Sequence, residues 1–213
     1  MNYIIFFIVC YAHVFAQIPE SPQLAEELYK QLFKRQRVNH LEAIKSFRKI
    51  SHYEKQYSMI QIMAEKVFSN IQEHRAAIEA SSFIPGVSEF PSDNNVREAL
   101  SSILENTALF SEIIIRYPDI AVDVLKTNNN WDVLLQWGIA FSNQMRYLLD
   151  KGTIKLLHLV SQELNHIDKD PNYVNPYRKI KPTQDANETE IHKTQKKAKK
   201  IKKGPRMIIH NEL

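Results

Sequence analysis

Cysteine is almost absent from this chain. Of its 213 residues only Cys10 is a cysteine, and it stands in an apolar run near the N-terminus. A small disulfide-stapled domain needs several cysteines and a thioredoxin-like oxidoreductase needs a reactive pair, so the sequence excludes both classes. The fold must therefore depend on a hydrophobic core, and the roughly 150 residues between that run and a polar tail are enough to build one.

Glycine and proline are also scarce. The chain has four glycines, and no proline lies between Pro22 and Pro85. Because these two residue types are the usual helix breakers, residues 23–84 are predicted to form either one very long helix or a helical hairpin. Apolar residues in the second half of this stretch recur at alternating steps of three and four, the spacing of a heptad seam. The seam consists of Ile50, Tyr53, Tyr57, Ile60, Ala64, Val67, Ile71, His74 and Ile78.

Local signals predict the next helices. A loop at residues 85–91 holds two prolines and a glycine. Asp93 then stands where it can cap a helix that ends at Tyr117, because a carboxylate there can accept a bond from the first turn. Pro118 suits the first position of a short helix that reaches about residue 126, since its fixed φ fits that position.

A further helix is predicted to carry both tryptophans. Asn residues at 128–130 can cap its start, and Lys151-Gly152 is predicted to close its end. It is apolar around much of its circumference, which predicts a central position, and Gly138 would allow a close helix crossing.

The last predicted helix is amphipathic and stops at residues 168–171. Its apolar positions are Ile154, Leu157, Val160 and Leu164. No convincing strand pair is present. The predicted fold is therefore all-α, a helical bundle with a long N-terminal helix or helical hairpin, followed by a disordered basic tail.

The N-terminus resembles a secretory signal peptide. Residues 3–15 are almost entirely apolar, and the small residue Ala16 places the cleavage site between Ala16 and Gln17. As a helix this run would span only about 20 Å, short of the roughly 30 Å hydrocarbon core of a bilayer. We therefore expect cleavage and no stable membrane insertion.

The C-terminus ends in His210, Asn211, Glu212 and Leu213. This tetrapeptide has the form of the KDEL/HDEL retrieval signal, which a receptor reads to return escaped proteins to the endoplasmic reticulum. Such a signal has meaning only on a chain that enters the secretory pathway. The two ends together predict the lumen of the endoplasmic reticulum, with partial secretion, and the KDEL receptor as one partner.

The chain divides into four predicted segments: a signal peptide at 1–16, a helical bundle at 17–170, a proline/aromatic strap and polar linker at 171–188, and a basic disordered tail at 189–213. The tail carries eight Lys or Arg against two Glu, a net charge of +6, which leaves −2 for residues 1–188. Its cations include Lys196, Lys197, Lys199, Lys200, Lys202, Lys203 and Arg206. Because no aromatic residues interleave with these lysines, the tail is interpreted as solvated and no nucleic-acid partner is expected. Asn187 begins a candidate N-glycosylation sequon.

Catalytic motifs are missing. The sequence holds no HExxH, no GxSxG elbow, no GxGxxG turn and no phosphate-binding GxxxxGK loop. Glu163 and His166 have the Glu-x-x-His spacing of di-iron bundles, but those sites need a second copy and further glutamates. The prediction is a non-enzymatic binding protein without metal or cofactor.

Several segments resemble the coiled-coil domain-containing protein 134 family. They are residues 28–30, residues 105–110 continuing to 116–118, residues 130–144, and residues 203–206 before the terminal Glu-Leu. The resemblance follows the same order along most of the chain. Its candidate partner-contact or family-motif residues are Glu105, Asn106, Thr107, Phe110, Arg116, Tyr117, Pro118, Asn130, Trp131, Trp137, Gly138, Asn143 and Gln144. The aromatic side chains Phe110, Trp131, Trp137 and Phe141 are nevertheless expected in the core more than at an interface.

The resemblance implies a non-enzymatic factor of the endoplasmic reticulum lumen. Family members of this kind regulate folding and N-glycosylation of the chaperone endoplasmin at the translocon and its oligosaccharyltransferase, which would be partners here. The first alternative is a secreted, cytokine-like helical protein that dampens mitogen-activated protein kinase signalling through ERK and JNK. The second is a nuclear adaptor that acts through the basic tail, which the signal peptide opposes.

Overall fold

The computed structural model describes residues 21–50 and 52–178, and every structural statement below concerns these residues. The predicted signal peptide, the Asn187 sequon, the basic tail and the retrieval signal lie outside them, and the predicted segment boundaries stay predictions. The elements are α2 (Pro22–Ser46), η2 (Phe47–Lys49), α3 (Tyr53–Ala80), α4 (Asn94–Arg116), α5 (Pro118–Leu125), α6 (Asn129–Gln144), η3 (Arg146–Leu148) and α7 (Lys151–Glu163). The described region is helical without strands, which confirms the all-α prediction.

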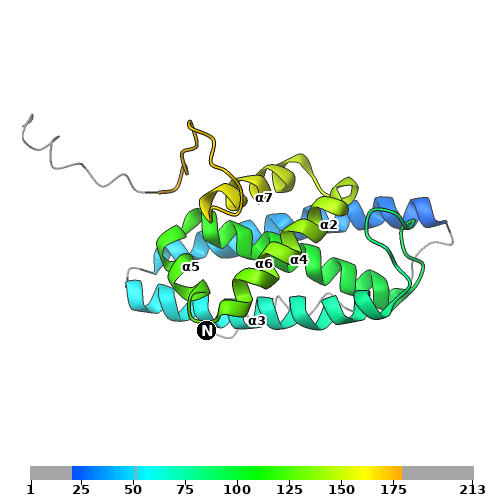
Figure 1. The fold of residues 1–213 in the computed structure, drawn as a ribbon, viewed down its shortest axis with the longest axis horizontal. Helices are drawn as coiled ribbons and strands as arrows, with labels where there is room; N and C mark the ends of the chain where they lie inside the picture. The colour runs from blue at the N-terminus through cyan, green and yellow to red at the C-terminus, as the bar shows by residue number, and fades with distance from the viewer. Residues whose placement is uncertain (1–20, 51, 179–213) are drawn as a thin grey trace, which may run out of the picture. The chain divides into compact units, whose positions relative to one another are not determined.

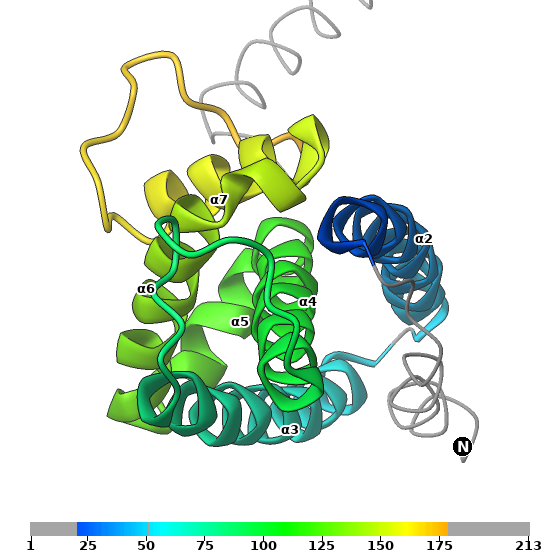
Figure 2. The same ribbon diagram turned by 90° about the vertical axis from the view of Figure 1, so that its right-hand side faces the viewer.

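Helix α4 forms the centre of the domain. It packs against α2, α3, α5, α6 and α7, which surround it in Figure 2. Sixteen of its 23 residues are buried, including polar ones such as Thr107 and Ser111. The sequence predicted the tryptophan helix as the central one, and this was wrong. Helix α6 buries one face only and leaves Val133 56% exposed, because α4 lies between it and α2.

The first long apolar stretch folds as two helices, the second of the two predicted alternatives. Figure 1 shows α2 and α3 running along the bundle as separate rods. After the short η2 turn, Ile50 takes an extended conformation with ψ 107°. The side-chain amide of Gln56 donates to the carbonyl of Ile50 at 2.7 Å, which satisfies one of the carbonyls that the chain reversal leaves without a helical partner. No glycine or proline marks this break, so the positions of helix-breaking residues could not predict where α2 ends and α3 begins.

The heptad seam is partly confirmed by burial. Ile60, Ala64, Val67, Ile71 and Ile78 are buried against the rest of the bundle. Tyr53, at the start of α3, is 55% exposed. The fully buried part of the seam therefore begins about two turns into the helix, and Ile50 and Tyr57 before it pack partly buried against the same core.

Two of the predicted caps are confirmed and one boundary is corrected. Asp93 accepts from the backbone N–H of Val96, and Asn128 accepts from that of Asn130. Lys151-Gly152 does not close α6, which already ends at Gln144. These two residues form the first turn of α7 instead, because Asp150 accepts from the N–H of Thr153 and caps a new helix there.

An aromatic cluster joins three helices in the core. The Phe68 ring of α3 lies 4.8 Å from the Phe110 ring of α4 and 5.4 Å from the Trp131 ring of α6, measured between centroids. Nearby, α6 crosses α4 closely at Gly138. A β-carbon built on Gly138 would lie 2.5 Å from the Thr107 hydroxyl oxygen, which confirms the predicted crossing.

We predict that Gly138→Ala destabilises the domain. The added methyl group cannot fit beside Thr107, which is fully buried, so overpacking exceeds the gain in helix propensity. The free energy of unfolding should fall by about 1–2 kcal/mol in urea titrations. Thr107→Ala in the same chain should restore most of the loss, because it removes the clashing atoms. Asn143→Ala, on the exposed face of α6, is the control. If Gly138→Ala and Asn143→Ala lowered the free energy of unfolding equally, the argument from the close crossing would be contradicted.

Candidate binding surfaces

The candidate contact residues separate by depth. Buried members are Asn106, Thr107, Phe110, Pro118, Trp131 and Gly138, half-buried members are Glu105, Arg116, Tyr117 and Trp137, and exposed members are Asn130, Asn143 and Gln144. Phe110, Trp131 and Phe141 lie in the core, as expected, whereas Trp137 lies at its edge. The helix from 105 to 116 therefore offers little surface, because α4 is central. Contact with a partner stays a prediction for all of these residues.

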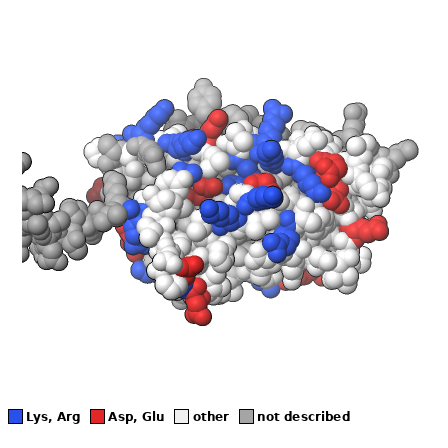
Figure 3. Space-filling model, turned by 90° about the horizontal axis from the view of Figure 1, so that it is seen from above, with Lys and Arg blue, Asp and Glu red and all other residues white. Residues whose placement is uncertain are grey.

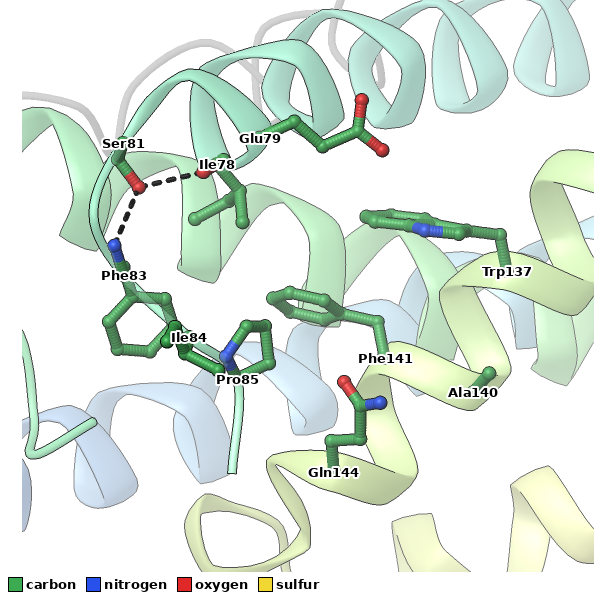
Figure 4. Close-up of a pocket in the computed structure, with 10 residues that line it drawn as sticks. All are labelled: Ile78, Glu79, Ser81, Phe83, Ile84, Pro85, Trp137, Ala140, Phe141 and Gln144. Atoms are coloured by element: carbon green, nitrogen blue, oxygen red, sulfur yellow. Dashed lines mark hydrogen bonds between the residues drawn. The ribbon is translucent and has the colours of Figure 1, made fainter. Parts of the chain in front are cut away.

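The structure brings Trp137 and Gln144 together in one groove. The groove has a volume of about 320 Å³ and lies between the end of α3, the loop after it, and α6. Figure 4 shows Trp137 and Phe141 on the α6 side of the groove and Ile78 on the α3 side, with Gln144 and Pro85 farther along. Ile84 stands at the rim and is 57% exposed. The groove is an apolar cleft with polar groups at its ends.

Charged residues and a tight turn shape this groove. The Arg75 guanidinium lies 4.9 Å from the centre of the Trp137 ring and pairs with Glu79 at 2.7 Å. The loop approaches α6 closely at Gly86, which has φ 77° and whose β-carbon would lie 3.2 Å from the Gln144 carbonyl oxygen. A side chain at Gly86 would be strained, so the glycine fixes the loop that forms one wall. The sequence signalled a loop here but not a groove.

A buried ionic cluster holds α2 on α4. The Arg37 guanidinium of α2 pairs with Glu112 of α4 at 2.7 Å, and both side chains are less than a tenth exposed. The other carboxylate oxygen of Glu112 pairs with Arg116 at 3.0 Å. Each oxygen therefore has a cationic donor, the condition under which a buried carboxylate is tolerated.

Helix α7 joins the same cluster through a neutral side chain. The Arg37 Nε donates to the Thr153 hydroxyl at 3.1 Å, and that hydroxyl donates to Asp150 at 2.7 Å. Burial alone would raise the pKa of Asp150, but bonds from Thr153 and the nearby Arg37 charge hold this pKa below its usual value. Arg37 thus links three helices. The sequence did not reveal it, because Arg37 reads as one more cation on a charged helix.

We predict that Glu112→Gln strongly destabilises the domain. Neutralising Glu112 leaves two cations, Arg37 and Arg116, without a counter-charge in a largely desolvated position. The free energy of unfolding should fall by about 3 kcal/mol. Glu98→Gln on an exposed turn of α4 should change it by less than about 0.5 kcal/mol in the same urea titrations. A loss below about 1 kcal/mol for Glu112→Gln would show that the cluster contributes little.

Two titratable groups lie along the α2 and α4 helices. His40 of α2 is buried, and burial, together with the Arg37 charge, lowers its pKa to about 3. Glu105 of α4 is half-buried, and burial raises its pKa to about 7. Burial and the Glu105 charge raise the pKa of Tyr29, which shows that this carboxyl faces α2. The folded state therefore favours neutral forms of both His40 and Glu105.

We predict opposing pH dependences for these groups. The folded state keeps His40 unprotonated, so the free energy of unfolding falls as pH drops from the ordinary histidine pKa of 6.5 towards 3. The folded state keeps Glu105 protonated, so the free energy of unfolding falls as pH rises from the ordinary glutamate pKa of 4.5 towards 7. Between pH 4.5 and 6.5 the slopes oppose each other.

Single variants should separate the two slopes. In His40→Gln, stability should fall as pH rises through the shared window, and in Glu105→Gln it should fall as pH drops, each by up to about 1.4 kcal/mol per pH unit. Urea titrations at half-unit steps of pH measure both. If both variants gave curves of unfolding free energy against pH that were parallel to the curve of the parent chain, the assignment of the two slopes to His40 and Glu105 would be refuted.

The segment after α7 is tied back onto the bundle. Glu163 accepts from the Tyr173 hydroxyl at 2.6 Å and from Arg178 at 2.5 Å. Asn175 donates to the Ile115 carbonyl of α4 at 3.0 Å. His166 instead contacts Asp132 at 2.9 Å, so the Glu-x-x-His pair serves two different structural contacts.

Within the described ranges, 21–50 and 52–178, no group of three or more His, Cys, Asp or Glu side chains is placed to hold a metal ion. In the same ranges, no helix is long and apolar enough to span a bilayer.

Comparisons with known proteins cover most of the chain. A family model described as "ERK and JNK pathways, inhibitor" matches residues 17–208. The coiled-coil domain-containing protein 134 of Xenopus tropicalis is 33% identical over 193 residues, which cover 86% of this chain and 84% of that relative. The Mus musculus protein of the same name is 30% identical over 192 residues, covering 85% and 83%. No solved structure matches the chain.

The family description names an inhibitor of signalling pathways, which is a regulatory role. The comparisons agree with the resemblance in the sequence, and the matches extend over most of both chains. The chain belongs to the coiled-coil domain-containing protein 134 family, whose family model is described as an inhibitor of the ERK and JNK pathways.

Proposed function

We propose that this chain is a non-enzymatic helical protein that restrains signalling through ERK and JNK by binding a partner. The family description, which matches residues 17–208, carries this proposal. It favours the first alternative from the sequence over the regulation of endoplasmin. The proposed route is entry into the secretory pathway, because the N-terminus resembles a signal peptide, followed by release of the fraction that escapes retrieval through the C-terminal signal.

The apolar groove of Figure 4 is the proposed contact surface. A binding protein needs a concave site with apolar walls and a few polar groups, and this groove has both. Trp137 and Arg75 at its edge are of the residue types that dominate binding energy at protein interfaces. By contrast, the residues of α4 that resemble the family are mostly buried and support the wall from behind.

We predict that Ala140→Glu weakens the signalling effect without unfolding the protein. Ala140 lines the groove and is exposed on α6, so the change puts a charge into the apolar cleft while leaving the core intact. The assay adds purified protein to stimulated cells and follows phosphorylated ERK and JNK. The unmodified protein should lower both, and Ala140→Glu should raise the half-effective concentration at least about tenfold, the equivalent of about 1.4 kcal/mol.

Ala76→Glu is the matched control. Ala76 is also an exposed helical alanine, on α3, and it does not line the groove. It should retain full activity, with circular dichroism showing both variants folded. Equal loss in the two variants would remove the groove from the proposal. No effect of the unmodified protein on either kinase would remove the function itself.

A second candidate function rests on a different observation. The terminal sequence from His210 to Leu213 favours retention in the endoplasmic reticulum lumen, where the family resemblance points to endoplasmin and the oligosaccharyltransferase. The two candidates differ in the partner they require. Recovery of endoplasmin with the intact chain, in cells whose ERK and JNK phosphorylation does not respond to added protein, would favour this second function.

A further inference from the structure

The helices of the described domain divide by charge. Residues 22–49 and 146–163, which form α2, η2, η3 and α7, hold ten Lys or Arg against five Asp or Glu, a net of +5. Residues 52–145 hold six Lys or Arg against twelve Asp or Glu, a net of −6. The near-neutral total of the domain therefore hides a strong asymmetry between its two sides.

The basic side has exposed cations that lack partners. Lys34 and Lys45 of α2 and Lys151 and Lys155 of α7 are exposed. None of these four lysines forms an ion pair with a carboxylate in residues 21–50 or 52–178. We call these four residues the lysine face. Their charges are available to an anion from solution.

The four lysines stand on neighbouring helices. The bond from Arg37 to Thr153 places α2 directly beside the first turn of α7. Helical spacing puts Lys34 and Lys45 on the same side of α2, roughly 60–80° around the helix from Arg37. It puts Lys151 and Lys155 together on the solvent-facing side of α7, opposite the buried Thr153. Figure 3 shows Lys and Arg side chains spread across the middle of this face, with larger acidic groups towards its right-hand and lower edges.

The composition of the face selects the kind of anion. Protein interfaces depend on aromatic and apolar anchors. The large apolar side chains exposed on these elements are Leu24 and Val38 of α2 and Tyr147 of η3, and none of α7, all of which is described, is exposed. Arg35 of α2 and Arg146 of η3 are exposed on the same elements, so guanidinium groups add to the point charges of the four lysines. An extended, flexible chain bearing many anionic groups fits such a face better than a folded protein.

We propose that the lysine face binds a sulfated glycosaminoglycan chain. The positions from Lys34 to Lys45 extend about 16 Å along α2, so several sugar units lie across the two helices. Affinity comes from release of the counterions that both polyelectrolytes hold in the free state. The binding takes its biological setting from the proposed entry into the secretory pathway. It uses a different surface from the groove, so it can succeed or fail independently of the signalling effect.

The test measures binding of the purified full chain to heparin. The variant Lys34→Glu/Lys155→Glu reverses one charge on each helix of the face. At about 0.15 M salt it should weaken binding about tenfold and reduce the slope of log Kd against log salt by about two. Heparin stripped of its sulfates should bind weakly to both proteins.

Lys55→Glu/Lys66→Glu is the matched control. Both lysines are exposed on α3, and the pair changes the net charge by the same amount. The basic tail is identical in all three proteins, so it cannot produce a difference between the variants. The control should bind heparin within about twofold of the parent chain, with unchanged thermal midpoints in both variants.

Three outcomes would overturn the proposal. Equal weakening in the two variants would show that only net charge matters, and no weakening in either would assign heparin binding to the tail. Polyglutamate that binds as tightly as heparin, with the same dependence on Lys34 and Lys155, would make the partner an acidic peptide instead.

Discussion

Everything in this domain depends on enclosing α4, which is buried along most of its length after Glu98. A buried stretch of helix cannot turn its polar side chains to water, so each of them must find a partner inside or remain unsatisfied at a cost of about 1–3 kcal/mol. Asn106 solves this locally by donating to the Ser102 carbonyl at 2.8 Å. Glu112 solves it across helices, through Arg37 and Arg116. The second solution fixes where α2 and α7 must lie.

The enclosure also explains why the two sides of the bundle differ. On the α2 side, Tyr29 and Phe33 pack in an apolar cluster with α4, and the polar contacts of Arg37 and the titratable Glu105 are added to it. On the α3 and α6 side the contacts are aromatic, around Phe68, Phe110 and Trp131. Apolar residues of this side also form the groove at one end, where Trp137 and Phe141 are among the lining residues. The α2 side instead presents lysines.

The function proposed for this family member belongs to surfaces rather than to a reactive centre. The groove offers apolar walls and an edge with Trp137 and Arg75, which suits a protein segment, whereas the lysine face offers unpaired charge, which suits a polyanion. Both surfaces are built on helices that α4 holds rigidly from behind. A protein that acts by binding gains from this arrangement, because preorganised surfaces lose less entropy when a partner docks.

The sequence by itself determined the fold class, the caps at Asp93 and Asn128, the start of α5 at Pro118 and the close crossing at Gly138. Each of these depends on a residue's own backbone or side-chain chemistry and on neighbours a few positions away. Only the tertiary structure decided that α4 rather than the tryptophan helix is central, and that Arg37 is a buried link between three helices. The local sequence around an arginine on an amphipathic helix is the same whether the arginine is buried or exposed. In the same way, the sequence of an apolar helix with two tryptophans does not tell whether the helix is central or peripheral. The partners that decide their burial lie far away in the sequence, such as Glu112, 75 positions from Arg37, and Phe68, which stacks on Trp131, so no local pattern can reveal them.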